Sequence, residues 1–185
     1  MSTQLLKRTA RAKRDPKARF PSLAHVLTPD FLRETWRQLN RKGASGIDGE
    51  TIAEFEAHLE ERMEDLWRRL KAGQYQAPPV RRVEIPKGTG KPRPLGIPTV
   101  EDRLLQRAVA RILRAIYEQD FLACSFGYRT GRNPHMALKA RRDHLVTGKG
   151  RHVDDTDIQG DFTNLNQQWL RKMIARRIAD PVITG

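Results

Sequence analysis

The most regular hydrophobic pattern in the chain lies between Thr51 and Gly73. Apolar side chains recur there at spacings of three and four, which places them on one face of an α-helix. Thr51 with Glu54 forms a capping box at the start, and Gly73 is a suitable residue just beyond the end. The pattern predicts one helix that buries Ile52, Phe55, Leu59, Met63, Leu66 and Leu70.

Four further stretches predict amphipathic helices by the same spacing. Thr28–Pro29 starts the first, because threonine caps free backbone N–H groups and proline suits the first helical position. Thr99 starts a second helix that reaches about Tyr117, Asn133–Pro134 starts a third, and the fourth covers 169–178. The helix that follows Thr99 also carries four arginines, Arg103, Arg107, Arg111 and Arg114.

Two neighbouring segments predict a β-hairpin. Val80–Ile85 is rich in strand-forming residues, and the prolines of Arg93–Pro98 restrict that strand to a sheet edge. The tight turn between them carries Lys87 and Lys91. These cations can grip a triphosphate or a nucleic-acid backbone, or they can simply keep an exposed edge from pairing with another chain. A further short strand is predicted over 153–158.

The charge balance narrows the function classes. The 185 residues include 35 Lys and Arg against 22 Asp and Glu, a net charge of +13 with a pI near 10.6. So basic a surface points to a polyanion such as RNA or DNA. An anionic membrane is the weaker alternative, because the basic residues are not gathered along one amphipathic helix. With neither a membrane-spanning run nor a signal peptide, we expect a cytoplasmic protein without membrane contact.

The first 27 residues are predicted to form a basic, disordered arm. Seven basic residues face a single acid, Asp15, within the first 20 positions, and few apolar residues accompany them. Such an arm can follow phosphates or can serve only to keep the protein in solution.

Two segments that contain glycines are candidates for contact with nucleic acid. The turn Gly43–Gly49 could bring the backbone close to a phosphate, although it has no P-loop pattern. The loop Ser125–Arg132, which reads S-F-G-Y-R-T-G-R, combines two aromatic rings with two arginines. This combination suits stacking on bases and holding phosphates. The alternative places the rings in the core and the arginines in solvent.

The stretch His152–Asn166 is the candidate chemical centre, because it concentrates acidic residues. Asp157, near the end of the predicted strand, would be a suitable oxygen ligand for Mg²⁺. Acidic residues between two glycines are also typical of a solvated turn. The single cysteine, Cys124, excludes an internal disulfide and a cysteine-based zinc cluster.

Four motifs in order resemble those of group II intron reverse transcriptases/maturases. They are the G-A-S-G-I-D-G turn, the I-P-K-x-x-G-K-x-R-P-L-G-I-P-T-V-x-D-R hairpin and helix, the S-F-G-Y-R-T-G-R loop and the D-I-Q-G-x-F segment. The resemblance implies an α+β fold, an incomplete right-hand polymerase. The mostly helical fingers with their β-hairpin would occupy 28–150, after the arm 1–27, and the first palm strand and helix would lie in 151–185.

The resemblance also implies roles for individual residues. Asp157 matches the first catalytic aspartate, a ligand of both Mg²⁺ ions, and Ile158 would offer a backbone carbonyl. Lys87, Arg93 and Phe162 match positions that contact the incoming dNTP. The nucleic-acid contacts would come from Lys91, Arg129, Arg132, Gly46 and Gly49.

The family reaction is addition of dNTPs to a primer, in which two Mg²⁺ ions activate the primer 3′-hydroxyl and hold the triphosphate. The Y-A-D-D element that completes this site in the family is absent from the sequence. Asp154 also departs from the family, which has an apolar strand residue there, and burying a carboxylate unpaired is costly.

We therefore expect a truncated enzyme that is inactive as an isolated chain. Its partners would be intron or template RNA and a DNA primer, with a second polypeptide as a potential source of the rest of the palm. One alternative is a basic RNA-binding remnant without catalysis. Another is a product that aggregates through apolar faces left exposed on the last helix.

Overall fold

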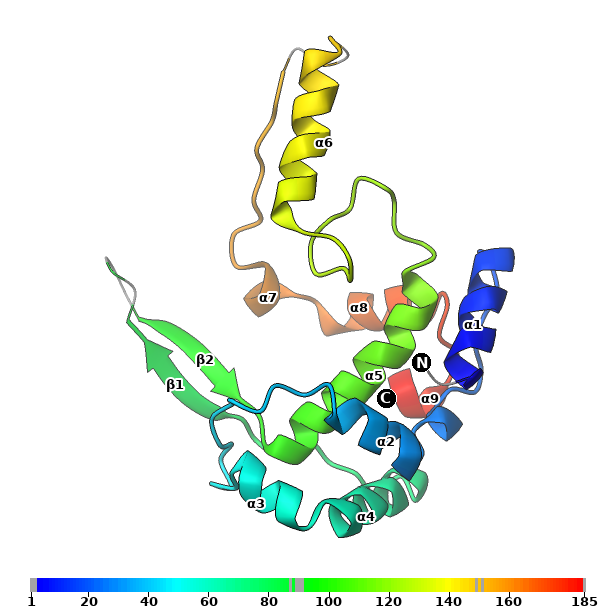
Figure 1. Cartoon of the computed structure of the whole chain (residues 1–185), viewed down its shortest axis with the longest axis vertical. Helices are drawn as coiled ribbons and strands as arrows, with labels where there is room; N and C mark the ends of the chain where they lie inside the picture. The colour runs from blue at the N-terminus through cyan, green and yellow to red at the C-terminus, as the bar shows by residue number, and fades with distance from the viewer. Residues whose placement is uncertain (1–2, 87, 89–91, 149, 151, 185) are drawn as a thin grey trace.

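The computed structural model describes residues 3–86, 88, 92–148, 150 and 152–184, apart from the side chains at 162 and 163. Figure 1 shows α5 running through the middle of the molecule, with the hairpin to one side and α6 projecting from one end. The elements follow in the order α1 (Thr3–Arg14), η1 (Ala24–Val26), α2 (Pro29–Trp36), α3 (Ile52–Ala57), α4 (Leu59–Lys71), β1 (Arg81–Ile85), β2 (Arg93–Ile97), α5 (Val100–Tyr117), α6 (Pro134–Val146), α7 (Asp161–Asn164), α8 (Gln167–Ile174) and α9 (Pro181–Thr184).

Helix α5 is the central element of the core. It buries one complete face, on which Leu104, Ile112 and Ile116 recur at helical spacing, and it packs against α1, α2 and α3. Trp36 of α2 stacks on Phe55 of α3 with the ring centroids 5.1 Å apart. Each large apolar side chain buried in this way contributes roughly 1.5–3 kcal/mol. The core is therefore built on the helical faces that the sequence pattern predicts.

Capping hydrogen bonds confirm the predicted helix starts. The Thr28 hydroxyl accepts from the N–H of Phe31 at 3.2 Å, and the Thr99 hydroxyl accepts from the N–H of Asp102 at 3.2 Å. Thr51 and Glu54 form both bonds of the capping box. The Thr51 backbone N–H, followed by its hydroxyl, holds the pKa of the Glu54 carboxyl below its ordinary value. Short-range polar signals thus fix where these helices begin.

The helix predicted from Thr51 to Gly73 is divided in two. His58, between α3 and α4, leaves the helical region with φ −118° and ψ 28°. Phe55 before the bend and Met63 after it are both fully buried, so the bend lets two helical segments face the same core. The second segment stops as predicted, because Gly73 takes a left-handed conformation with φ 67°.

The N-terminal segment differs from the disordered arm that the sequence predicts. Residues 3–14 form α1, which buries Leu5 and Ala12 and packs against α5. Farther along, Phe20 is 1% exposed and forms an isolated parallel bridge with Ile178. Local composition suggested an arm because only a few of these residues are apolar, but those few meet partners in distant parts of the chain, in α5 and at Ile178.

The junction between the two ends of the described chain depends on Arg177 and Asp180, which are 5% and 3% exposed. The Arg177 guanidinium donates to the carbonyl oxygens of Ala12, Asp15 and Ala18 at 3.0–3.3 Å. It also lies 3.0 Å from a carboxylate oxygen of Asp120. The buried Arg177 guanidinium therefore links the end of α1 and the turn after it to Asp120, just beyond α5.

Asp180 binds the backbone at the start of the 3-10 helix η1. Its carboxylate accepts from the N–H groups of Leu23 at 2.5 Å, Ala24 at 2.7 Å and Val182 at 2.9 Å. Burial alone would raise the pKa of the Asp180 carboxyl, but these backbone N–H groups and that of Ile183 hold it below the ordinary value of 3.8. The negative charge is thus the form that stabilises the fold.

The predicted hairpin is present. Strands β1 and β2 pair antiparallel in a register that runs from Arg81 opposite Ile97 to Ile85 opposite Arg93. They form a two-stranded sheet, so the described part of the chain is rich in helix, with one small antiparallel sheet. Across these described residues, no helix is both long and apolar enough to cross a membrane.

The strand predicted over 153–158 is not formed. Residues 152–158 adopt no helix or strand, and they are exposed throughout. A strand needs a neighbour for its N–H and C=O groups, and an isolated extended segment has none to stabilise it. The short helix α7 follows directly. The segment predicted to form the first palm strand is therefore an exposed, irregular connection between α6 and α7 in this structure.

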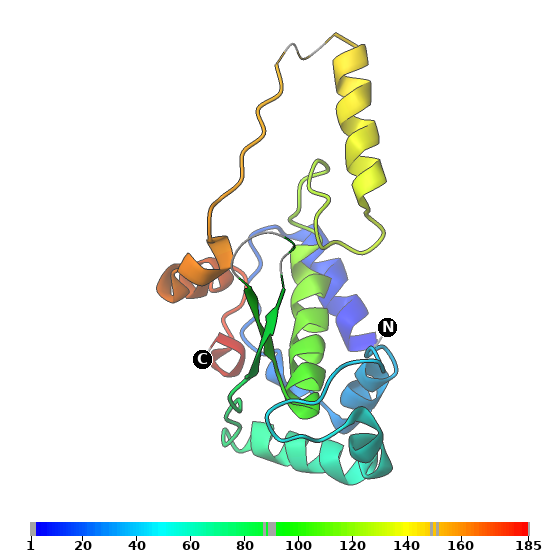
Figure 2. The same ribbon diagram turned by 90° about the vertical axis from the view of Figure 1, so that its left-hand side faces the viewer.

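Two helices keep predicted apolar faces in solvent. Figures 1 and 2 show α6 extending away from the rest of the molecule, and none of its residues is buried. Met136 and Leu145 are 39% and 38% exposed. On α8, Trp169 and Met173 are 60% and 62% exposed. The sequence pattern located these helices, and the exposed face of α8 agrees with the alternative in which the last helix leaves an apolar face uncovered.

Removing the Asp180 charge tests the junction. Asp180→Asn is expected to lower the free energy of unfolding near neutral pH by about 1–3 kcal/mol, because it weakens three hydrogen bonds to backbone N–H groups. A pKa held below 3.8 in the folded state means that the contribution is complete above that pH. It is lost as the pH falls through the folded value. Urea unfolding at a series of pH values measures both effects.

The matched control is Asp30→Asn, because the Asp30 side chain is 92% exposed. Its effect should stay within about 0.5 kcal/mol. Equal losses from the two variants, or a difference from wild type that does not shrink on acidification, would contradict the role assigned to Asp180.

Candidate nucleic-acid interface

Asp157 lies on the exposed segment that joins α6 to α7, and its neighbour Ile158 is 69% exposed. Within the described residues, no three His, Cys, Asp or Glu side chains gather closely enough to hold a metal ion. The described residues therefore gather no set of three such ligands around Asp157, and its role as a Mg²⁺ ligand stays a prediction. Phe162 belongs to α7, but its side chain lies outside what the structure describes.

Of the predicted dNTP contacts, Arg93 is the one that the described residues place on the hairpin. Arg93 is exposed at the start of β2, where it pairs with Ile85 at the end of β1. Lys87 and Lys91 lie outside the described residues. The exposure of Arg93 leaves its guanidinium accessible to a phosphate, and the roles of the two lysines stay predictions.

The glycine turn packs against the start of α5. A Cβ atom at Gly46 would lie 2.6 Å from the Cα of Thr99, so the two backbones approach too closely for any side chain. Gly49 takes the left-handed region at φ 75° with open space around it. Arg103 donates to the carbonyl of Ala44 at 2.8 Å and holds the turn in place. Packing within the protein therefore accounts for Gly46, which was predicted to contact nucleic acid.

The Arg129 side chain points into the protein. Its side chain is only 7% exposed and forms an ion pair with Glu118 at 2.7 Å. It also donates to the carbonyls of Leu122 and Ser125 at 2.8 Å and lies over the Phe121 ring, 5.0 Å from its centroid. These contacts engage the guanidinium in shaping the loop. The nucleic-acid contact predicted for Arg129 would require it to leave all of these partners.

Two other residues of the same loop differ in exposure, because Tyr128 faces solvent and Arg132 is half-buried. Tyr128 is 96% exposed and has φ 56°, a left-handed conformation that is costly for an aromatic residue. Arg132 lies over the Phe126 ring, 5.4 Å from its centroid. The sequence singled out this loop by its aromatic and arginine content. It could not show that the Arg129 side chain is buried while the Tyr128 ring is exposed. The exposed Tyr128 is the residue with a face free to stack.

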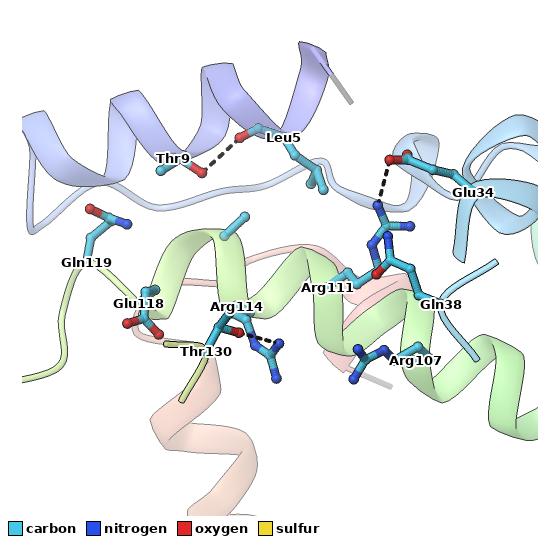
Figure 3. A pocket seen from close by; sticks show the side chains of 11 residues that line it. Leu5, Thr9, Glu34, Gln38, Arg107, Arg111, Arg114, Glu118, Gln119 and Thr130 are labelled. Atoms are coloured by element: carbon cyan, nitrogen blue, oxygen red, sulfur yellow. Dashed lines mark hydrogen bonds and ion pairs between the residues drawn. The ribbon is translucent and has the colours of Figure 1, made fainter. Parts of the chain in front are cut away.

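A groove lies between α1, α2 and α5 (Figure 3). It has a volume of about 420 Å³ and is lined by Leu5 of α1, Glu34 of α2, and Arg107, Arg111 and Arg114 of α5, with Thr130 of the loop also among its lining residues. The sequence pattern gave the arginines of α5 no role. Their helical spacing was the available signal, but only the docked position of α1 turns that face into a groove.

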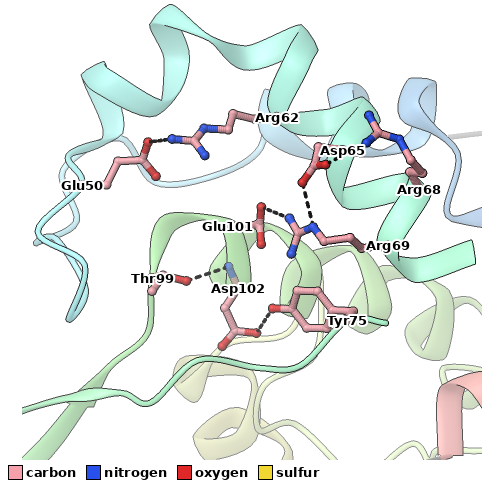
Figure 4. A network of polar contacts seen from close by, with 9 residues as sticks. All are labelled: Glu50, Arg62, Asp65, Arg68, Arg69, Tyr75, Thr99, Glu101 and Asp102. Carbon is pink, nitrogen blue, oxygen red and sulfur yellow. Dashed lines mark hydrogen bonds and ion pairs between the residues drawn. The ribbon is translucent and has the colours of Figure 1, made fainter. Parts of the chain in front are cut away.

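Arginines elsewhere in the core region pair with carboxylates. Figure 4 shows Arg69 of α4 between Asp65 and Glu101, with nitrogen–oxygen distances of 2.7 and 2.6 Å. Nearby, the Tyr75 hydroxyl donates to Asp102 at 3.0 Å. Burial, followed by the charge and hydrogen bond of Asp102, raises the pKa of Tyr75 above its ordinary value. This network joins α4 to α5, and its arginine, Arg69, is paired with carboxylates of the protein itself.

Comparison with known proteins gives relatives over most of the chain. No family model matches. The chain is 38% identical over 176 residues to Protein YkfC of Escherichia coli strain K12, a match that covers 91% of this chain and 46% of YkfC. It is 39% identical over 160 residues to the group II intron-encoded protein LtrA of Lactococcus lactis subsp. cremoris, which covers 84% of this chain and 26% of LtrA.

A eukaryotic relative shares part of the same region. The chain is 37% identical over 112 residues to a 91 kDa protein in the cob intron of Schizosaccharomyces pombe, a match that covers 60% of this chain and 14% of that protein. The chain thus spans about half the length of YkfC and about a quarter of LtrA. These matches confirm the resemblance drawn from the sequence motifs.

Replacing Gly46 tests whether the glycine turn is fixed by packing. Gly46→Ala should destabilise the fold by about 1–3 kcal/mol, because the new Cβ forces the turn away from Thr99. Gly127→Ala is the control, since a Cβ there meets nothing within 4 Å. Thermal unfolding of the two variants measures the difference. Equal midpoints would show that the close approach to Thr99 does not constrain Gly46.

Proposed function

The chain is a relative of the group II intron-encoded proteins, and we propose that it is the fingers part of a reverse transcriptase/maturase that binds RNA. The observation that carries this proposal is the identity to LtrA over 84% of the chain. A net charge of +13 supports a polyanionic partner. In this proposal the helical bundle and hairpin are the fingers of an incomplete right-hand polymerase, and residues 151–185 are the start of its palm.

The exposed groups favour RNA that is at least partly single-stranded. Tyr128 presents a ring that is 96% exposed, and unpaired bases stack well on such rings. Arg132, four residues farther along the same loop, is half-buried, and Arg93 is exposed on the hairpin. Aromatic faces next to cations are the combination that holds bases and phosphates together.

Catalysis is the second part of the proposal. Asp157 would be the first metal-binding aspartate of the palm, and Lys87, Arg93 and Phe162 would contact the incoming dNTP. The described residues bring no cluster of ligands to Asp157, so we assign no reaction step to this chain alone. Polymerisation would require carboxylates supplied by another segment or a second polypeptide, with a DNA primer as partner.

A primer-extension assay tests the catalytic part. The purified chain, given an RNA template, an annealed DNA primer, dNTPs and Mg²⁺, is expected to yield no extended product, because Asp157 alone cannot hold two ions for in-line transfer. A complete reverse transcriptase serves as the positive control. Product that depends on the template would contradict the proposed inactivity, and its loss in Asp157→Asn would assign that activity to this chain.

A salt titration of RNA binding tests the binding part. Affinity for a single-stranded RNA, measured by filter binding, should fall steeply as salt rises, because phosphate contacts release counterions. The logarithm of the affinity should fall by about 0.7 per phosphate contact for each tenfold rise in salt. Absence of RNA binding at about 50–100 mM salt, or an affinity that salt does not change, would refute RNA as the partner.

A further inference from the structure

We propose that the groove between α1, α2 and α5 holds the phosphates of a single-stranded RNA segment, with Arg107 and Arg114 as its ligands. The inference rests on the proposed RNA binding and gives it a location. None of the residues that line the groove belongs to the hairpin, to the glycine turn or to the segment around Asp157.

Arg107 is the first observation that carries the proposal. Within the described chain its guanidinium has no hydrogen-bond or ion-pair partner, and its Nε atom is buried without one. Leaving a buried donor unsatisfied costs on the order of 1–3 kcal/mol. Figure 3 shows Arg107 beside Arg111 on the groove face of α5, without a contact of its own. Arg107 lines the groove, so the terminal N–H groups of its guanidinium can donate to a phosphate oxygen there.

Arg114 is the second observation, because it has no carboxylate partner among the described residues. Its only described contact is a hydrogen bond to the Thr130 hydroxyl at 2.8 Å. That contact orients the guanidinium without neutralising its charge. Arg107 and Arg114 are seven residues apart, which is about two turns and roughly 10 Å along the helix. They therefore lie on one face and can contact separate phosphates of one strand.

Arg111, between them, has a different role. Its side chain is 9% exposed and lies 3.1 Å from a carboxylate oxygen of Glu34. It also donates to the Thr35 hydroxyl at 2.6 Å and lies over the Phe31 ring, 4.5 Å from its centroid. This arginine is a positioning residue that fixes α2 against α5. Its ion pair with Glu34 also offsets the negative charge of that carboxylate, which would otherwise repel a phosphate in the groove.

The rest of the lining favours a nucleotide strand over an isolated anion. Leu5 and Ala115 form an apolar part of the wall, and the volume of about 420 Å³ is in the range of a ligand pocket. The second acid of the groove, Glu118, is held by Arg129 at 2.7 Å. Unpaired cations beside an apolar wall can accept phosphates together with a sugar or a base.

The experiment compares two double variants with equal loss of charge. Arg107→Gln with Arg114→Gln removes the proposed ligands. Arg62→Gln with Arg68→Gln removes two arginines of α4 whose side chains are 48% and 72% exposed and which do not line the groove. Binding of a single-stranded RNA is measured by filter binding across a salt series. The groove variant should bind at least about tenfold more weakly at low salt, and its salt slope should fall by about 1.4, against little change in the control.

A charge-preserving variant and a folding check keep the result interpretable. Arg107→Lys with Arg114→Lys should retain most of the salt slope, since the charges remain. Far-ultraviolet circular dichroism and thermal unfolding should show that all variants keep the wild-type helix content and midpoint. A groove variant that remains folded and still binds RNA like the α4 control would overturn the groove proposal.

The outcomes separate the two proposals. If the wild-type chain binds no RNA, the proposed function fails and the groove proposal fails with it. If the wild type binds RNA and the groove variant matches the control, only the groove proposal fails. If the groove variant loses affinity for polyglutamate as strongly as for RNA, the site is a general polyanion surface and the assignment to RNA is wrong.

Discussion

The buried contacts of Arg177 and Asp180 are the constraint on which the rest of the molecule depends. Arg177 donates to three carbonyl groups in the last turn of α1 and the segment after it, and Asp180 accepts from N–H groups at the start of η1. Both residues come from the last part of the described chain. A buried charge is stable only when it is paired and hydrogen-bonded, so these two residues specify one arrangement of the chain ends. That arrangement holds α1 against α5 and thereby creates the groove.

Two groups of arginines have different contacts, a difference that composition alone does not show. Arg69, Arg111, Arg129 and Arg177 have carboxylate or carbonyl partners and act inside the fold. Arg107 and Arg114 have no carboxylate partner in the described chain and line a groove. The net charge of +13 indicates a polyanion, but only the contacts show which cations remain available to bind it.

The features that the sequence predicted best are those that depend on residues close together in the chain. The caps at Thr28, Thr51 and Thr99 and the hairpin pairing of β1 with β2 each depend on residues close in sequence. The failures involve distant partners. α1 is ordered through contacts with α5 and the C-terminal junction, and residues 152–158 lack a neighbouring strand. The nucleic-acid contacts of Gly46 and Arg129 stay predictions, but a motif could not show that Gly46 packs against Thr99 or that Arg129 pairs with Glu118.

Native-state hydrogen exchange at the backbone N–H groups of Phe20, Leu23, Ala24 and Ala179 tests this dependence most directly. These groups donate across the junction between the two ends of the described chain. They should exchange only through global unfolding, as slowly as the buried amides of α5. Rapid exchange at these four positions with slow exchange in α5 would show that the N-terminal segment is a loose arm. In that case α1 would form no wall, and the groove would not exist in solution.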